Sequence, residues 1–466
     1  MTVKLVLIPV VVCALVIAVS AFVFLKEAPP QSPGQQTGTP TLPPSALVGS
    51  LIQPSNLEYK GAFRLPAGVS ETIGWEWGGS AMAYYPSGDS SGASDGYPGS
   101  IFGAGHNQTH YISEISIPAP AISSNKSLSD LNTATTLGQF TNVRSGISAL
   151  EQIYTDSALN YVGMEYLPAQ GSQTSGKLYL CWAAHFQDAP LDVPSHMWCD
   201  TNLTNQQGSW RVLDNSFVTL YSTNNYMFEI PANVADNYFS GRRLATGRYR
   251  DGGWGGMGPN LFAVAPWASG NPPAAGTTLP TTTLLRYAST HQEGYQYVGN
   301  YNYKMDNYQH SDEWVGGAWL TVDNRSAVIF MGTKGTGSKN AWYGYPNGLV
   351  WPDEAPFPSE PSYPFEERGW WTESFEARIL FYNPLDLIAV ANGSKQPHEP
   401  QPYASMSIDN FLFNIDKMNH PDFADSLNKY RISACSYDRS NQLLYIFEYR
   451  GDSETDRPLC HVFKIN

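Results

Sequence analysis

Basic residues are scarce in this sequence. Of its 466 residues only 27 are Lys or Arg, against 41 Asp or Glu, and the formal net charge is −14. Nucleic-acid binding depends on Lys and Arg side chains that displace the counterions of the phosphate backbone. The composition therefore argues against a nucleic-acid-binding protein, and no basic stripe appears along the chain. An acidic chain with only 15% charged residues suits a soluble extracellular protein.

Helix signals are also few. Aromatic residues make up 13% of the chain, which contains 41 Gly and 34 Pro. This composition is typical of many short strands joined by irregular loops. The length by itself would suggest two or three domains, but a repeated β architecture of this size counts as one.

Motifs with recognised chemistry are missing as well. The sequence has no phosphate-binding glycine loop, no nucleophile elbow and no cysteine spacing of a zinc site. No cofactor is predicted. A bound divalent metal stays open as an alternative, because several imidazoles and one carboxylate could converge near the centre of the fold. These residues are His106, His110, His185, His196, His310 and Asp312.

The sequence contains five cysteines, of which Cys13 lies in the apolar N-terminal run. The other four are an even number outside the cytoplasm, which indicates disulfides. Cys181 and Cys199 lie on consecutive predicted strands, so we predict a cross-strand disulfide between them. Cys435 and Cys460 lie on the first and third strands of one unit. That places them roughly 10 Å apart, too far for a disulfide unless they meet beyond the strand ends.

The N-terminal end carries a long apolar run. Residues 5–25 are almost continuously apolar between two lysines, so residues 1–26 are predicted to be a signal peptide or a transmembrane anchor. Residues 27–55 are rich in Pro, Gly, Ser and Thr and are predicted to be a disordered linker. Both interpretations place residues 56–466 outside the cytoplasm, at the cell surface or secreted after cleavage.

A hairpin followed by a third strand recurs along residues 56–466. Its clearest copy comprises residues 432–438 and 443–450, followed by residues 460–465. The first arm ends at a turn-forming Asp, and the second is rich in β-branched and aromatic residues. Four similar units begin near residues 81, 163, 226 and 318, and residues 57–63 could supply the strand that the last unit lacks. We predict an all-β fold, a β-propeller of five four-stranded blades whose ring is closed by an N-terminal strand. A pair of all-β sandwich domains is the alternative.

These repeated hairpins resemble those of secreted β-propeller proteins, and the resemblance covers roughly residues 51–466. Five-bladed propellers of similar appearance include glycosidases and sugar-binding lectins. The resemblance therefore implies both activities, but no motif in this sequence matches either group residue by residue. It carries over no catalytic residue, because a shared fold does not establish a shared function.

The predicted topology gathers unusual residues on one face. In an up-and-down blade, the loop that enters the first strand and the loop that leaves the second open on the same side. The loops on this side include an aromatic insertion at residues 335–376, and long loops inside a domain are usually functional. The tryptophans here either pack between blades or form a platform for sugar rings and other flat ligands. The predicted ligand-binding residues are Trp75, Trp77, His106, His185, Arg250, Trp254, His310, Trp314, Lys334, Trp370 and Trp371.

The same face holds carboxylates that could work in pairs, as glycoside hydrolysis requires. The candidate catalytic residues are Glu76, Asp251, Asp312 and Glu313. Asn-x-Ser/Thr patterns for glycosylation begin at Asn107, Asn125, Asn202, Asn324 and Asn392. All of these except the first fall in loops on the opposite face or the outer edge.

Three functions follow from these observations. The first is an extracellular propeller, tethered or secreted, that binds a glycan or another extracellular ligand on its aromatic-rich face. The second is a glycosidase-like hydrolase or lyase that uses the loop carboxylates. The third is a structural or adhesive surface protein that binds protein partners. A membrane partner is expected only if the N-terminal segment remains uncleaved.

Overall fold

The computed structural model describes residues 43–151, 158–184, 194–212, 223–248, 256–288, 303–309, 311–342, 370–414 and 431–466. The chain divides into the units Met1–Gly38 and Thr39–Asn466, and all described residues belong to the second. Among these ranges there is no helix with the length and apolarity of a membrane span. The predicted signal peptide or anchor, residues 1–26, lies outside them.

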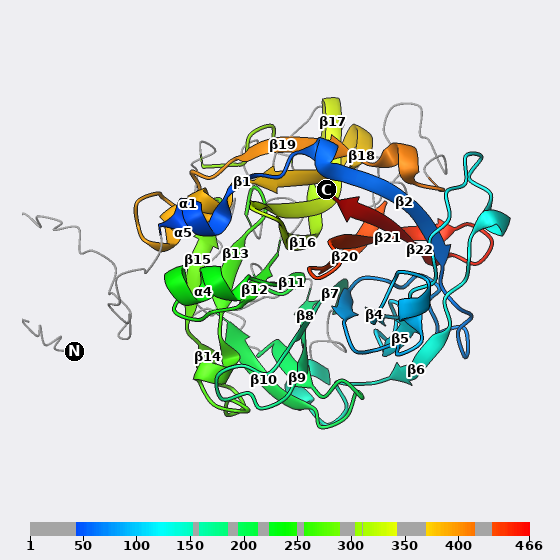
Figure 1. Ribbon diagram of the computed structural model, residues 1–466, viewed down its shortest axis with the longest axis horizontal. Helices are drawn as coiled ribbons and strands as arrows, with labels where there is room; N and C mark the ends of the chain where they lie inside the picture. The colour runs from blue at the N-terminus through cyan, green and yellow to red at the C-terminus, as the bar shows by residue number, and fades with distance from the viewer. Residues whose placement is uncertain are drawn as a thin grey trace, which may run out of the picture. The chain divides into compact units, whose positions relative to one another are not determined.

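The described strands form five sheets arranged in a ring, so the predicted five-bladed β-propeller is confirmed (Figure 1). Consecutive strands within each sheet pair antiparallel. The first sheet contains β3 (Met82–Tyr85), β4 (Ser100–Ala104), β5 (Ile112–Ser116) and β6 (Thr136–Thr141). The second contains β7 (Ala158–Leu167), β8 (Lys177–Ala184), β9 (His196–Cys199) and β10 (Gln207–Val212), with β14 (Thr278–Leu279) added in parallel.

The third sheet contains β11 (Tyr226–Glu229), β12 (Leu244–Gly247), β13 (Leu261–Val264) and β15 (Thr281–Leu285). The fourth contains β16 (Glu313–Val322), β17 (Arg325–Trp342), β18 (Trp370–Tyr382) and β19 (Pro402–Ser407), with β1 (Ser50–Leu51) parallel to β17. The fifth joins β20 (Ile432–Asp438), β21 (Leu443–Asp452) and β22 (Arg457–Ile465) to the N-terminal strand β2 (Leu57–Arg64). The outer strand of the last sheet thus comes from the other end of the folded unit.

The innermost strands β3, β7, β11, β16 and β20 contact one another in that order, and β20 contacts β3. Residues at or near the starts of β3, β11, β16 and β20 meet the middle of β7 around one point on the axis. The innermost strands therefore all begin on the same face, which we call the upper face, and end on the lower face. Because strand direction alternates within each sheet, the loops that leave every second strand also lie on the upper face.

The strand topology shows on which face of the propeller each Asn-x-Ser/Thr pattern lies. Asn125, Asn202, Asn324 and Asn392 are exposed and lie in connections between the first and second or the third and fourth strands of their sheets, on the lower face. Asn107 follows β4 on the upper face and is partly buried.

The helices are short. α1 (Pro44–Val48) precedes β1, and α4 (Ala232–Tyr238) and α5 (Pro384–Ala391) lie between strands. The 3₁₀ turns include η1 (Pro54–Asn56), η2 (Gly92–Ser94), η3 (Leu128–Asp130), η5 (Pro266–Ala268) and η7 (Asp409–Phe411). Structure begins earlier than the predicted end of the linker at residue 55. Val48 of α1 is 2% exposed within the core between the third and fourth sheets. Gly49 ends α1 with φ +66°, where a Cβ would lie 1.9 Å from the carbonyl oxygen of Asn324. Only glycine fits this close approach.

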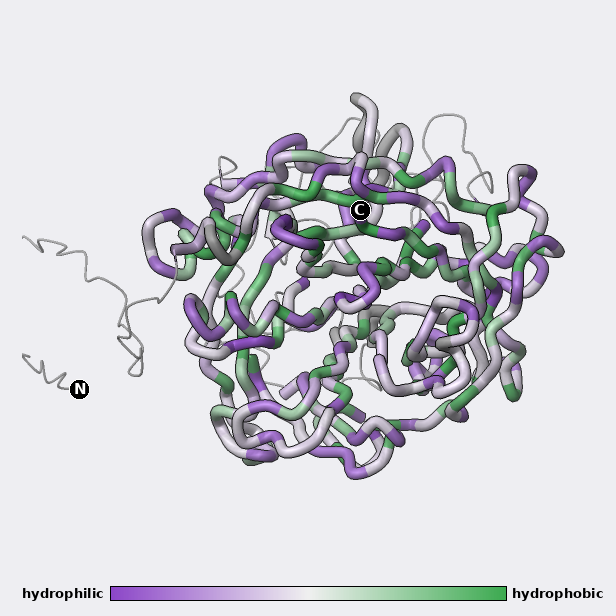
Figure 2. The backbone as a smooth tube through the Cα atoms, viewed as in Figure 1, coloured by the Kyte–Doolittle hydropathy of each residue, from purple (hydrophilic) through white to green (hydrophobic). Residues whose placement is uncertain are grey.

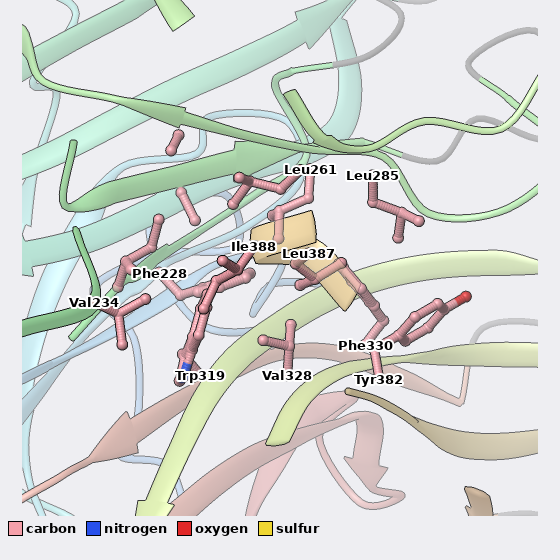
Figure 3. Close-up of a cluster of buried hydrophobic side chains, with 14 of the residues drawn as sticks. Phe228, Val234, Leu261, Leu285, Trp319, Val328, Phe330, Tyr382, Leu387 and Ile388 are labelled. Atoms are coloured by element: carbon pink, nitrogen blue, oxygen red, sulfur yellow. The ribbon is translucent and has the colours of Figure 1, made fainter. Parts of the chain in front are cut away.

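The core lies between neighbouring sheets. Figure 3 shows the cluster between the third and fourth sheets, where Phe228, Trp319 and Phe330 pack with Leu387 of α5. Phe330 meets Tyr382 edge-on at 5.3 Å between ring centroids. Burial of each such side chain contributes about 1.5–3 kcal/mol. Hydrophobic stretches follow the strands, and hydrophilic stretches concentrate in the connections (Figure 2).

The predicted disulfide between Cys181 and Cys199 is wrong. Cys199 lies opposite Leu178 in the ladder, whereas Cys181 lies opposite His196. Since side chains alternate between the two faces of a sheet, Cys199 packs with Leu178 in one core cluster and Cys181 packs in another. All four cysteines of the described residues are free and buried. Cys435 and Cys460 are separated by β21, as their predicted spacing required.

Candidate functional site

Several predicted site residues lie outside the described ranges, namely Asp251, His185, Arg250, Trp254 and His310. Trp370 and Trp371 begin β18, where their backbones pair with Trp342 and Ala341 of β17. The predicted insertion at residues 335–376 is therefore strand at both ends, and residues 343–369 lie outside the described part of the chain.

Two of the predicted platform tryptophans are core residues instead. Trp75 and Trp314 are both 0% exposed. Trp75 meets Phe140 and Phe447 edge-on at 5.1 and 6.3 Å, across the boundary between the first and last sheets. Gly103 has no side chain and so leaves room for the indole of Trp75. A Cβ at position 103 would lie 2.8 Å from the indole ring. These two residues pack between blades and do not present a surface to a ligand.

Asp312, a predicted catalytic residue, is fully buried and holds the start of β16 in place. Its Oδ1 accepts hydrogen bonds from Nζ of Lys334 and the backbone nitrogen of Gly335, both at 2.9 Å. Its Oδ2 accepts from the backbone nitrogen of Gln309 at 3.1 Å. Burial raises the pKa of the Asp312 carboxyl, and the Lys334 ammonium opposes that rise. Both carboxylate oxygens of Asp312 therefore make hydrogen bonds that stabilise the fold. The neighbouring Glu313 is buried as well.

The described histidines do not converge on a metal. The imidazole of His196 is within 3.0–3.1 Å of Ser195 Oγ, the Thr223 carbonyl oxygen and Thr246 Oγ1. Burial lowers the pKa of His196 to about 3, and burial with the nearby Arg144 charge does the same for His110. In the part of the chain that the structure describes, no three His, Cys, Asp or Glu side chains form a group that could hold a metal ion.

The remaining predicted residues, Glu76, Trp77 and His106, lie together on the upper face beside the turn between β21 and β22. The guanidinium of Arg450 lies 3.7 Å from the ring centroid of Trp77. Nε and Nη2 of Arg450 donate to Oδ1 of Asp456 at 3.0 and 2.7 Å. The backbone nitrogen of Trp77 donates to the carbonyl oxygen of Asp456 at 3.0 Å. A stacked aromatic–guanidinium pair therefore joins the first sheet to the last.

Three residues of this arrangement share an unusual backbone. Trp77, Arg450 and Asp456 have φ values of +55°, +53° and +57°. A non-glycine residue in this left-handed region costs roughly 1–2 kcal/mol. Such residues persist where surrounding contacts hold them, and they concentrate at ligand-binding and active sites.

Glu76 completes the arrangement. Its Oε1 accepts from Nε of Arg457 at 2.7 Å, and its Oε2 is buried against Gly74, where a Cβ would lie 2.2 Å from that oxygen. His106 is 7% exposed, and burial lowers the pKa of its imidazole against the opposing charge of Glu76. Nδ1 of His106 accepts from the backbone nitrogen of Gln108 at 3.0 Å. We call Glu76, Trp77, Arg450, Asp456 and Arg457 the seam cluster.

The seam cluster offers hydrogen-bond donors beside an aromatic ring. Arg457 bonds Glu76 through Nε, and no described residue binds its Nη groups, while its side chain is 18% exposed. Trp77 is partly exposed. Two carboxylates balance the two guanidinium groups, so the cluster has no net charge of its own. Its chemistry suits a neutral ligand with both an apolar face and hydroxyl groups.

Sequence reasoning missed Arg450, Asp456 and Arg457. They stand more than 370 residues from Trp77 and form no local motif with it. The available signal was the predicted closure of the ring, which brings the last blade against the first. The turn after residue 450 opens on the same face as the loop that holds Trp77.

No protein-family model and no curated protein matches this chain. Solved structures do resemble it. A mutant of the α-L-arabinofuranosidase Arb93A from Fusarium graminearum, in complex with an iminosugar inhibitor, is 8% identical with a TM-score of 0.32, over 88% of this chain and 98% of that one. The Dos1 propeller is 8% identical with a TM-score of 0.24, over 79% of this chain and 66% of that one. Both are remote likenesses of fold.

Proposed function

We propose that this β-propeller is an extracellular recognition module that binds a neutral glycan at the seam cluster on its upper face. The observation that carries the proposal is the contact between Trp77 and Arg450, in which both partners and the supporting Asp456 hold left-handed backbones. This contact keeps a partly exposed indole in one orientation. A fixed aromatic ring loses little conformational entropy when a ligand stacks on it.

The charge balance of the seam cluster selects the kind of glycan. Glu76 neutralises Arg457, and Asp456 neutralises Arg450. A uronate or sulfate group would add a negative charge without a free partner, next to a chain of net charge −14. A neutral sugar places its hydroxyl oxygens near the Nη groups of Arg457 and its apolar face against the indole. We therefore expect neutral polysaccharides to bind in preference to acidic ones.

The N-terminal segment supports the extracellular location. Residues 1–26 have the composition of a signal peptide or anchor, and four of the five glycosylation patterns lie on the lower face, away from the seam cluster. A glycan attached at those asparagines would leave the upper face open to a ligand.

A binding screen of the full chain against neutral and acidic polysaccharides tests the proposal. Trp77→Ala is expected to weaken binding at least about tenfold, or roughly 1.4 kcal/mol. The matched control is Tyr97→Ala, which removes a half-buried aromatic ring from the β3–β4 connection on the lower face. Equal affinity of both variants and the wild type would exclude the seam cluster as the site.

The same screen separates the alternatives. Release of reducing sugar, abolished by Glu76→Gln, would make the protein a glycosidase-like hydrolase. Absence of binding to every polysaccharide would leave the adhesive surface protein as the better description.

A further inference from the structure

A small cavity lies on the axis of the propeller. Residues in or just before the innermost strands of all five sheets line it: Ser80 and Asn225 precede β3 and β11, and Gly163, Gly316 and Cys435 lie in β7, β16 and β20. The cavity leaves about 10 Å³ for the centre of a water-sized sphere. That volume suits about one water molecule. The cavity is independent of the seam cluster and of its proposed ligand.

Asn225 lines this cavity and carries an unsatisfied acceptor. Its Nδ2 donates to the carbonyl oxygen of Trp314 at 2.9 Å, which assigns the orientation of the amide. Its Oδ1 is buried and has no hydrogen-bond partner among the described residues, and the residue is 1% exposed. Oγ of Ser80 is likewise buried without a partner in the described part of the chain. A buried polar atom left in this state costs about 1–3 kcal/mol.

The strand edges add further polar groups. Each innermost strand pairs with a neighbour on one side only, so backbone N–H and C=O groups on its other side face the axis. The groups around the axis therefore include donors as well as acceptors. Among the residues that the structure describes, no carboxylate lines the cavity. A cation would find carbonyl oxygens here but also N–H groups and no compensating negative charge, whereas a water molecule can both donate and accept.

We propose that one ordered water molecule occupies this cavity and bridges Oδ1 of Asn225 to Oγ of Ser80. The water molecule donates one hydrogen bond to the amide oxygen of Asn225. It forms a second with the Ser80 hydroxyl group, which can act as donor or acceptor. The bridge ties the first sheet to the third across the axis, where these sheets do not pair.

A high-resolution crystal structure of the full chain grown with rubidium chloride tests the ligand. We expect one peak of water height within about 2.6–3.2 Å of both oxygens, without anomalous signal. An anomalous peak would show that a monovalent cation occupies the cavity and would overturn the assignment of a water molecule. Empty density would overturn the proposal altogether.

Oxygen-17 magnetic relaxation dispersion tests the site in solution, because it counts long-lived buried waters. Ser80→Ala removes a hydroxyl that no described residue binds, so the fold should tolerate it, and the bridging water should exchange faster. Asn225→Leu should lose one long-lived water. Ser433→Ala is the control, since its hydroxyl donates to the Gly79 carbonyl oxygen outside the cavity. An unchanged water count in Asn225→Leu would contradict the assignment.

Discussion

Oε2 of Glu448 lies 2.9 Å from Nε2 of His461, and both side chains are almost completely buried. The same carboxylate accepts the backbone N–H groups of Phe413 and Asn414 at 2.7–2.9 Å. On the other side of the imidazole, Nδ1 lies 3.0 Å from the hydroxyl of Tyr59. One chain of hydrogen bonds thus connects β2, β22, β21 and the segment after β19, where the two ends of the propeller meet.

Replacement of Glu448 should destabilise this closure. Glu448→Ala leaves an imidazole and two backbone donors buried without an acceptor, so we expect a loss of about 3–5 kcal/mol in the free energy of unfolding. Glu448→Gln keeps one acceptor oxygen and should lose less. Urea denaturation measures both. The control Glu454→Gln removes a carboxylate that is 65% exposed beside Arg64 and should change stability by less than about 1 kcal/mol. A loss no larger in Glu448→Ala than in the control would show that the network does not support closure.

The Glu165 carboxyl should make stability depend on pH. Partial burial and the nearby charge of Glu229 raise its pKa well above the ordinary value of 4.5, against the opposing charge of Arg439. The folded state therefore holds this proton more tightly than the unfolded state does. Its unfavourable contribution is absent below pH 4.5 and grows as the pH rises from there towards the folded-state pKa.

Glu165→Gln, which is always neutral, should therefore raise the melting temperature at pH 8 and leave it almost unchanged at pH 4. Differential scanning calorimetry at both values measures the difference. Glu71→Gln, at an exposed position, serves as the control and should leave the melting temperature almost unchanged at both pH values. A stabilisation of the same size at pH 4 would contradict the assigned direction.

Trp75 and Trp77 should separate stability from recognition. Trp75 is fully buried between the first and last sheets, so Trp75→Ala should cost about 3–5 kcal/mol. Trp77 is partly exposed, and its replacement should cost less stability while it weakens ligand binding. Denaturation and binding measurements on the two variants give the comparison. A larger loss of stability in Trp77→Ala would assign that residue to the core.

The cysteines should react as free thiols only after unfolding. Burial raises the pKa of the Cys199 thiol to about 12 and that of Cys435 further, which suppresses the reactive thiolate. We expect iodoacetamide to modify Cys181, Cys199, Cys435 and Cys460 in denaturant without prior reduction, and to spare them in the native protein. Peptide mapping identifies the modified residues. A disulfide-linked peptide pair containing Cys181 and Cys199 would contradict the observed register.

The strands of the fold were largely predictable, but the roles of several side chains were not. First arms that end at a turn-forming residue, followed by second arms rich in β-branched and aromatic residues, predicted the hairpins of all five blades. Whether the side chains of Cys181 and Cys199 lie on the same face of the sheet depends on the register of β8 with β9. A shift of one residue in that register moves a side chain to the opposite face. Composition likewise does not separate Trp75 in the core from Trp77 at the surface, two positions along the same loop.

The sequence by itself determined an acidic, strand-rich chain with a five-fold repeat, because local patterns of apolar residues and turns specify strands and their order. It also identified Trp77 and Glu76 as residues of the upper face. Only the tertiary structure decided their partners, since closure of the ring brings Arg450 and Arg457 of the last blade against the first. Contacts between residues so distant in the chain depend on the register and packing of every blade between them, which no local pattern contains.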